Sequence, residues 1–208
     1  MTTVFLVRHG ATDWNDALRA QGHADVPLNE KGDRQARTAA DRLKSQPING
    51  VYSSDLSRAR ATAERIAAIH GLPVIEASAL REIDQGEWTG LNDKEIKVRW
   101  PGAWEARRQI QRPGGESPAQ VRRRAIDALA EIVSASPTGT IVIVSHGVTI
   151  RGILAEALGL DDADATGLRG LGNGGIVRFE ASQRDGRLVF GEVHRLDEKT
   201  PAGEDPNA

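Results

Sequence analysis

The stretch VFLVRHGATDWN, residues 4–15, decides the fold of this chain. It opens with four apolar residues that do not alternate with polar ones, which is typical of a strand buried on both faces of a parallel sheet. The strand then ends in Arg8, His9 and Gly10. One interpretation is that the strand simply reaches the surface there. The other is that it delivers the arginine and the histidine to a ligand site.

A second stretch repeats this pattern much later in the chain. TIVIV, residues 140–144, is another unbroken apolar run, and it is followed by Ser145, His146 and Gly147. Ligands of open parallel sheets bind beyond the carboxyl ends of the strands. A single histidine at a strand end is more often structural than catalytic, but two in matching positions, one of them beside an arginine, favour a shared site.

A third junction of this kind lies in VYSSDLSRARATAE, residues 51–64. Here Arg58 falls in the first turn of a predicted helix, where the helix dipole favours anions over cations. A bound anion between the helix and the arginine explains this position. Pairing of Arg58 with Asp55 or Glu64 is the alternative that the sequence leaves open.

Apolar residues at helical spacing predict helices between the strands. The best defined spans residues 117–136, because Ser117 is a suitable N-cap, Pro118 lies in the first turn and Gln120 takes the capping-box position. We expect the three consecutive arginines at 122–124 to be mostly solvated. The other predicted helices span residues 30–45, 57–71 and 148–159.

The weaker strand candidates are residues 74–76, 176–180 and 188–193. Asp185 and Gly186, between the last two, are typical of a tight hairpin. Strands that alternate with helices predict an α/β fold, a three-layer sandwich around a mostly parallel sheet. We expect a single domain over residues 1–195, followed by a polar, flexible tail at 196–208.

Composition limits the functions that this chain can have. With 27 basic and 29 acidic residues the formal net charge is −2, so anion binding has to come from local arginine placement. The absence of cysteine excludes thiolate metal sites and cysteine nucleophiles. No run approaches the roughly 20 apolar residues of a membrane span, and the first residues lack the features of a signal peptide. We expect a cytoplasmic protein with a small-molecule ligand and neither nucleic acid nor membrane as partner.

Four segments resemble the signature blocks of the histidine phosphatase superfamily, in its phosphoglycerate-mutase-like branch. They lie within residues 4–154, in the order of the family: LVRHGATDWN, YSSDLSRARATAE, LREIDQGEWTGL and IVSHGVTIRGIL. One departure is Thr89, where the family usually has an acidic residue. The resemblance implies the phosphoglycerate-mutase-like three-layer fold and chemistry that needs no metal and no cofactor.

The resemblance also implies a role for each matching residue. His9 would be the nucleophile that becomes a phosphohistidine, and Glu82 would be the general acid and then the base. Spacing alone does not separate Glu82 from Asp84 and Glu87. His146 would share in catalysis, and the phosphate pocket would comprise Arg8, Asn15, Arg58 and His146. Physical chemistry supports these roles, because arginines stabilise phosphoryl oxygens and nearby cations keep the histidine neutral.

By the same resemblance, Gln21 and Gly22 would line the substrate mouth. A cap segment is expected at about 91–116, in which Arg112 would bind substrate. Further candidates for reading the leaving group are Trp100, Trp104, Arg107 and Arg108, although both tryptophans are equally well explained by packing. Three histidines match no signature block and are expected at the surface: His23, His70 and His194.

The interval between Glu82 and His146 is shorter than in cofactor-dependent phosphoglycerate mutases. The chain is therefore expected to be a metal-independent phosphomonoesterase acting on a small phosphorylated metabolite. A cofactor-dependent phosphoglycerate mutase and a non-catalytic phospho-ligand-binding protein are the alternatives. Family phosphatases for phosphoserine, α-ribazole phosphate and glucosylated phosphoglycerate all remain open as models, and the resemblance also allows a homodimer.

Overall fold

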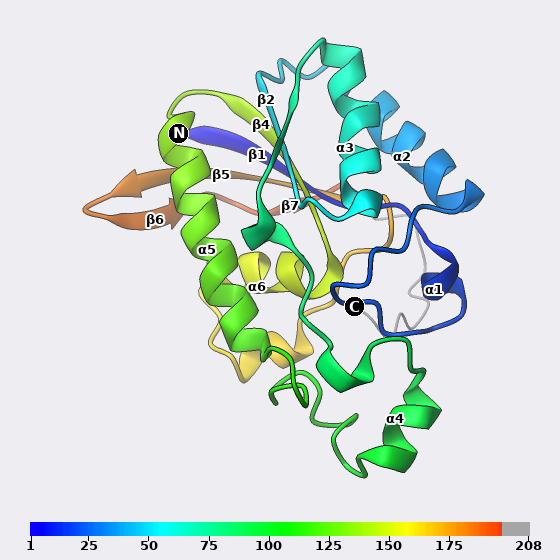
Figure 1. Cartoon of the computed structure of the whole chain (residues 1–208). Helices are drawn as coiled ribbons and strands as arrows, with labels where there is room; N and C mark the ends of the chain where they lie inside the picture. Colours follow the sequence, from blue (N-terminus) through cyan, green and yellow to red (C-terminus); the bar gives the residue numbers. More distant parts are fainter. Residues whose placement is uncertain (197–208) are drawn as a thin grey trace.

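A mixed sheet forms the centre of the molecule in the computed structural model, which describes residues 1–196 (Figure 1). Within this part of the chain the strand order is β3-β2-β4-β1-β5-β6, and β7 pairs with β5. The parallel strands are β1 (Thr2–Arg8), β2 (Gly50–Ser53), β3 (Val74–Glu76) and β4 (Thr140–Ser145). The strands that pair antiparallel are β5 (Ile176–Arg184), β6 (Arg187–Phe190) and β7 (His194–Arg195).

Helices cover both faces of this sheet, which confirms the predicted three-layer sandwich (Figure 1). The first face packs against α2 (Glu30–Leu43) and α3 (Ser57–His70), and the second against α5 (Pro118–Ala135) and α6 (Gly147–Ala157). The shorter helices are α1 (Asp13–Asp16), α4 (Asp93–Arg99), and the 3₁₀ turns η1 (Ser78–Leu80), η2 (Gly86–Trp88) and η3 (Asp164–Gly167).

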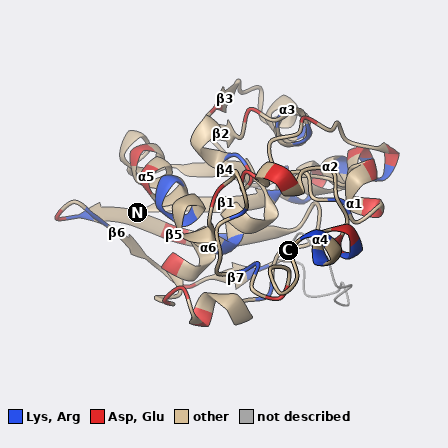
Figure 2. Cartoon of the chain, turned by 60° about the horizontal axis from the view of Figure 1, so that its bottom comes forward, with Lys and Arg blue, Asp and Glu red and all other residues tan. Residues whose placement is uncertain are grey.

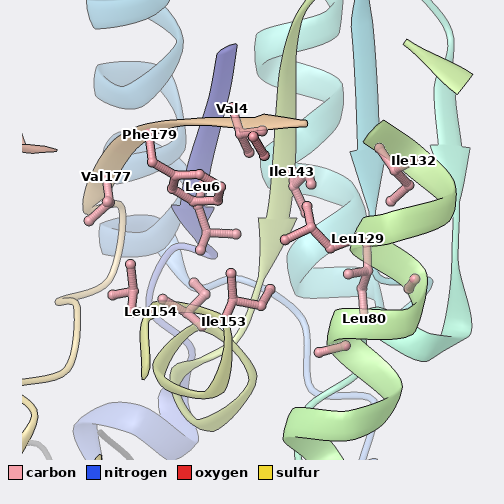
Figure 3. Packing of buried hydrophobic residues seen from close by; sticks show 14 of the residues in the cluster. Val4, Leu6, Leu80, Leu129, Ile132, Ile143, Ile153, Leu154, Val177 and Phe179 are labelled. Carbon is pink, nitrogen blue, oxygen red and sulfur yellow. The ribbon is translucent and has the colours of Figure 1, made fainter. Parts of the chain in front are cut away.

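The central strands β1 and β4 pair in register, so that Val7 lies beside Val144 and Arg8 beside Ser145. Alternate residues of a strand point to opposite faces. Thus Leu6 packs with the α5–α6 layer, where Figure 3 shows it near Phe179 and Ile143, while Val7 packs with the α2–α3 layer. Burial on both faces is the reason why neither apolar run alternates with polar residues.

The N-terminus of α5 confirms its predicted capping box. The Ser117 hydroxyl accepts from the Gln120 backbone N–H, and the Gln120 side chain accepts from the Ser117 N–H. The predicted solvation of the arginines that follow is wrong at two of three positions. Arg123 is exposed, but the side chains of Arg122 and Arg124 are only 18% and 22% exposed.

The predicted hairpin between β5 and β6 is confirmed. Asp185 and Gly186 have φ of 50° and 74°, the left-handed conformation that two-residue hairpin turns require. The tail expected at 196–208 lies outside the described residues from position 197 onward. Of the described helices, none has the length and the hydropathy that crossing a bilayer requires. In the view of Figure 2, basic and acidic positions are interspersed on α2 and α4.

The segment expected to form a cap packs around Trp88 in a small apolar cluster, separate from the two faces of the sheet. Trp88 is buried at its centre, with the ring centroids of Trp100 and Trp104 at 6.3 and 6.4 Å. Packing therefore accounts for both tryptophans. The limits of the cap at 91–116 and of the domain at 1–195 stay predictions.

Candidate active site

The two His-Gly steps meet at the carboxyl ends of β1 and β4, as the matched strand ends predict. The backbone N–H of His9 donates to the carbonyl of Ser145 at 3.0 Å, which extends the strand pairing by one residue. This contact brings the ring of His9 to 4.9 Å from that of His146, between centroids. Both side chains are almost completely buried.

Hydrogen bonds fix the His9 ring and its backbone. The Nδ1 atom lies 2.6 Å from the carbonyl oxygen of Gly10. A carbonyl only accepts, so Nδ1 carries the proton and Nε2 keeps its lone pair. The His9 carbonyl accepts from Nδ2 of Asn173 at 3.0 Å, and the Gly10 N–H donates to the hydroxyl of Thr62 at 3.1 Å. The arrangement presents Nε2 as a rigid, unprotonated nitrogen.

Gly10 is also required by packing. A Cβ atom at this position would lie 2.2 Å from the carbonyl oxygen of Gly32 in the first turn of α2. Two backbones therefore approach each other here more closely than any side chain allows. The turn after His9 is thereby held against α2.

Arg58 is completely buried at the start of α3. Its two terminal nitrogens donate to the carbonyls of Gly22 and Ala24, at 2.7 and 2.8 Å. Asp55 pairs with Arg81 and Glu64 with Arg60, so both alternative partners that the sequence offered for Arg58 are wrong. The guanidinium is instead held in the interior near the two histidines.

Burial and the two arginines keep both histidines neutral. Burial lowers the pKa of His9 well below its usual value, the charges of Arg58 and Arg8 lower it further, and the hydrogen bond to Gly10 opposes them. Burial, followed by the charge of Arg58, likewise lowers the pKa of His146. Neither ring nitrogen of His146 has a hydrogen-bond partner among the described residues. Such a ring is available to bind a ligand.

Glu82 lies between the site and α6. Its buried carboxylate accepts from the N–H of Val148 at 3.1 Å and from that of Ile83 at 3.0 Å. The first of these belongs to the N-terminal turn of α6, where the helix dipole favours a negative charge. Of the two competing carboxylates, Asp84 caps the N–H of Gly86 and Glu87 is exposed. Only Glu82 of the three is buried.

The backbone of Glu82 is held by two residues that sequence reasoning missed. Its carbonyl accepts from Nη2 of Arg124 at 2.8 Å and lies 2.9 Å from Nε2 of His23. The surface positions predicted for histidines are confirmed for His194 only, since His23 and His70 are partly buried. Helical spacing contained a signal for Arg124, which follows the buried Val121 by three positions and so shares its face.

The remaining pocket residues lie in the loop after β1. Asn15 is buried, and its Oδ1 accepts from the N–H of Thr12 in a capping box. This contact leaves the amide nitrogen of Asn15 as its donor. Gln21 is buried against the hydroxyl of Thr12 at 2.9 Å, and Gly22 contributes the carbonyl that Arg58 binds. All three lie within the network of the site, but their contact with a ligand stays a prediction.

Arg112 lies in a narrow cleft beneath the cap. Its guanidinium stacks 4.7 Å from the ring of Trp88, and its Nη1 donates to the carbonyls of Arg107 and Ile110. Arg112 therefore organises the cap as well as lining the cleft. Arg151 of α6, which sequence reasoning missed, lines the same cleft.

No group of three or more histidine, aspartate or glutamate side chains in residues 1–196 is arranged to hold a metal ion.

A mostly parallel sheet that brings two neutral histidines together beside a buried arginine defines the class of phosphoglycerate-mutase-like α/β proteins. Residues 4–192 match the histidine phosphatase superfamily (branch 1), and the chain belongs to this superfamily. It is accordingly an enzyme of that superfamily, a phosphatase or a mutase.

Three relatives illustrate the similarity. The chain is 36% identical to phosphoserine phosphatase 1 of Hydrogenobacter thermophilus over 77% of this chain and 78% of that protein. It is 36% identical to the probable phosphoglycerate mutase GpmB of Serratia proteamaculans, with 97% of each chain covered. The solved structure of mycobacterial glucosyl-3-phosphoglycerate phosphatase with VO3 superimposes with a TM-score of 0.84 at 33% identity, covering 90% of this chain and 95% of the other.

Proposed function

We propose that this chain is a metal-independent phosphomonoesterase that hydrolyses a small phosphorylated metabolite through a phosphohistidine on His9. The observation that carries the proposal is the 2.6 Å contact between Nδ1 of His9 and the Gly10 carbonyl, which leaves Nε2 unprotonated. A nucleophile whose other nitrogen is fixed needs no reorganisation before it attacks. The cytoplasm is the proposed location.

In the first step, Nε2 of His9 attacks the phosphorus atom in line with the leaving oxygen. A P–N bond forms while the P–O bond to the leaving group breaks, and protonated Glu82 gives its proton to the leaving oxygen. The guanidiniums of Arg8 and Arg58, the His146 ring and the Asn15 amide bind the phosphoryl oxygens. Phosphoryl transfer depends mainly on such positioning and charge stabilisation.

In the second step, Glu82 takes a proton from water while the water oxygen attacks phosphorus. The P–N bond breaks, inorganic phosphate leaves and His9 returns to its neutral form. Glu82 is suited to both steps because its carboxylate binds the N–H of Val148, two residues after His146, on a backbone held by Arg124. The same group thus donates and recovers one proton in each turnover.

Two of the relatives described above are phosphatases and one is a probable mutase, so transfer to a second substrate oxygen is the competing activity. A mutase has to exclude water from the phosphohistidine. The interval between Glu82 and His146 is short, and before α5 it holds only the turn η2 and the seven-residue α4. A short cap is less suited to excluding water than a long one. We therefore favour hydrolysis.

Hydrolysis of p-nitrophenyl phosphate in excess EDTA tests this proposal. The wild-type chain should turn over, His9→Ala should lose at least about a thousandfold in kcat, and the exposed His194→Ala should match the wild type. Rapid quenching should trap an acid-labile phosphoenzyme that His9→Ala lacks. An unchanged rate in His9→Ala would refute the histidine mechanism.

Two further outcomes separate the alternatives. Isomerisation of phosphoglycerate that depends on added bisphosphoglycerate, with hydrolysis much slower, would make the chain a mutase. Binding of inorganic phosphate without turnover of any ester would make it a phospho-ligand-binding protein. A sedimentation measurement at several concentrations decides whether the proposed homodimer forms.

A further inference from the structure

Arg151 is a buried cation that the proposed mechanism does not use. It lies on α6, one turn beyond Val148, whose N–H binds the Glu82 carboxylate. Only 8% of Arg151 is exposed. Its Nε and Nη2 atoms have no hydrogen-bond partner within residues 1–196. Burial of a charged guanidinium without hydrogen-bond partners costs folding free energy, which a bound anion would offset.

Arg124 differs from Arg151 in that its guanidinium is fully engaged in hydrogen bonds. A structural arginine donates its hydrogen bonds to backbone carbonyls and carboxylates. Arg124 does so to three carbonyls and to the carboxylate of Glu116. Arg112 likewise donates to the Gln85 side chain and to two carbonyls. Arg151 makes no such contact in the described part of the chain. Packing of the sheet alone does not account for its charge.

Arg151 faces a cleft that three cap arginines also line: Arg107, Arg108 and Arg112. In residues 1–196, neither Arg107, nor Arg112, nor Arg151 has a carboxylate partner within ion-pair distance. The cleft has a volume of about 30 Å³, enough for one or two waters. A carboxylate is larger than this volume, so the partly exposed side chain of Arg107 or Arg108 has to move when it enters. The cleft therefore gathers four arginines around one small space.

The charges in this cleft act on one another. Burial, followed by the charge of Arg108, lowers the pKa of Arg151 to about 10. Burial also lowers the pKa of Arg112 to about 10. Glu82 is the acid whose charge acts on both arginines, but its carboxylate accepts from the N–H of Val148 and, within residues 1–196, forms no ion pair with either of them. An anion bound in the cleft would relieve this repulsion.

We propose that this cleft is a second anion subsite, in which Arg151 binds a carboxylate or a second phosphate on the leaving-group side of the substrate. The inference rests on the proposed function, which places the leaving oxygen beside Glu82. One helical turn, about 5 Å, separates Val148 from Arg151. An anionic group three to five bonds beyond the leaving oxygen is therefore within range of a side chain as long as that of arginine. The substrate is a phosphomonoester with a second negative group, and Arg151 determines this specificity.

Matched pairs of esters test the subsite. O-Phosphoserine and O-phosphoethanolamine differ by one carboxylate, while propane-1,3-diol bisphosphate and 3-hydroxypropyl phosphate differ by one phosphate. The ratio of kcat/KM within a pair cancels general damage to the enzyme. The wild type should favour the anionic member of at least one pair by roughly ten- to hundredfold, as expected of a charge-assisted hydrogen bond, and the favoured pair identifies the anion.

Arg151→Met should bring this ratio close to one, and Arg151→Lys should restore part of it. The matched control is Arg123→Met, an exposed arginine on α5 whose loss should leave the ratio at the wild-type value. If Arg151→Met does not fold, Arg108→Met is the second variant. Arg108 also lines the cleft, and its loss should lower the same ratio of kcat/KM. A wild-type ratio near one in both pairs, or a preference that survives both substitutions, would overturn the proposal.

Binding without turnover separates this inference from the proposed function. Calorimetry on His9→Ala should show the same Arg151-dependent preference in Kd. If the wild type hydrolyses no ester but this preference is present, the subsite stands and the proposed function fails. If all esters are hydrolysed equally, the proposed function stands and the subsite fails.

Discussion

Replacement of Arg124 by alanine should separate the folding of the Glu82 loop from the phosphate pocket itself. Arg124 lies on α5 and contacts neither histidine of the pair. Its guanidinium binds the carbonyls of Ala79, Arg81 and Glu82 and forms an ion pair with Glu116. The arginine therefore fixes the backbone of the proposed acid and of the residues before it, and its partner Glu116 accepts from the N–H of Asp84 after it.

The size of the effect follows from these contacts. A buried acceptor that loses its donor costs about 1 to 3 kcal/mol, and loss of one member of a buried ion pair costs about 3 to 5 kcal/mol. Because the Arg124 side chain is 22% exposed, water replaces part of what is lost. We expect Arg124→Ala to lower the free energy of unfolding by roughly 2 to 4 kcal/mol.

Activity should fall for a separate reason. Displacement of a catalytic group by about 1 Å costs up to roughly a hundredfold in rate. We therefore expect kcat for p-nitrophenyl phosphate to fall ten- to hundredfold, with little change in KM, because the arginines that bind phosphate are untouched. Arg124→Lys should lie between, since one ammonium cannot reach all four acceptors.

Urea denaturation measures the free energy of unfolding, and steady-state kinetics on the folded variant measure kcat and KM. Both use phosphate-free buffer. Arg123→Ala, one position earlier on α5 and exposed, is the matched control and should stay within about 0.5 kcal/mol of the wild type. If Arg124→Ala keeps the wild-type kcat and loses less than about 1 kcal/mol, the positioning role is wrong.

Three further predictions follow from the buried groups. The pKa of His9 and of His146 is lowered in the folded state, so just below pH 6.5 these two side chains take up protons only in the unfolded state. The free energy of unfolding should therefore decrease as the pH decreases, by up to about 1.4 kcal/mol per pH unit for each histidine. Urea denaturation of His146→Gln between pH 7.5 and 5.5 should show a shallower dependence, and an equal slope would contradict this. Gly10→Ala places a Cβ 2.2 Å from a backbone oxygen and should lose about 1 to 3 kcal/mol and most activity, whereas Gly167→Ala, with open space around it, should be near neutral in the same assays. Inorganic phosphate at 100 times its Kd should stabilise the wild type by about 2.7 kcal/mol in thermal unfolding, and Arg58→Met should bind it far more weakly; equal shifts in both proteins would exclude Arg58 from the pocket.

The elements and their order could be predicted because their signals are local. Unbroken apolar runs identified β1 and β4, and three residues around Ser117 identified the start of α5. The meeting of His9 and His146 was also predictable, since parallel strands that end in equivalent positions place their next residues at one edge of the sheet. Resemblance to a family then named Arg58 and Glu82, whose roles stay predictions.

Tertiary structure alone decided which partners the buried charges have. Arg58 binds the carbonyls of Gly22 and Ala24 rather than the acids next to it in sequence, because α3 starts against the loop that follows β1. Arg124 reaches acceptors 42 to 45 residues away. Arg151 lines a cleft whose walls come from segments far apart in the sequence, among them the loop after β1, the expected cap and α6. Periodicity records which face of a helix is buried but not what lies opposite, and the chemistry of a buried cation depends on what lies opposite.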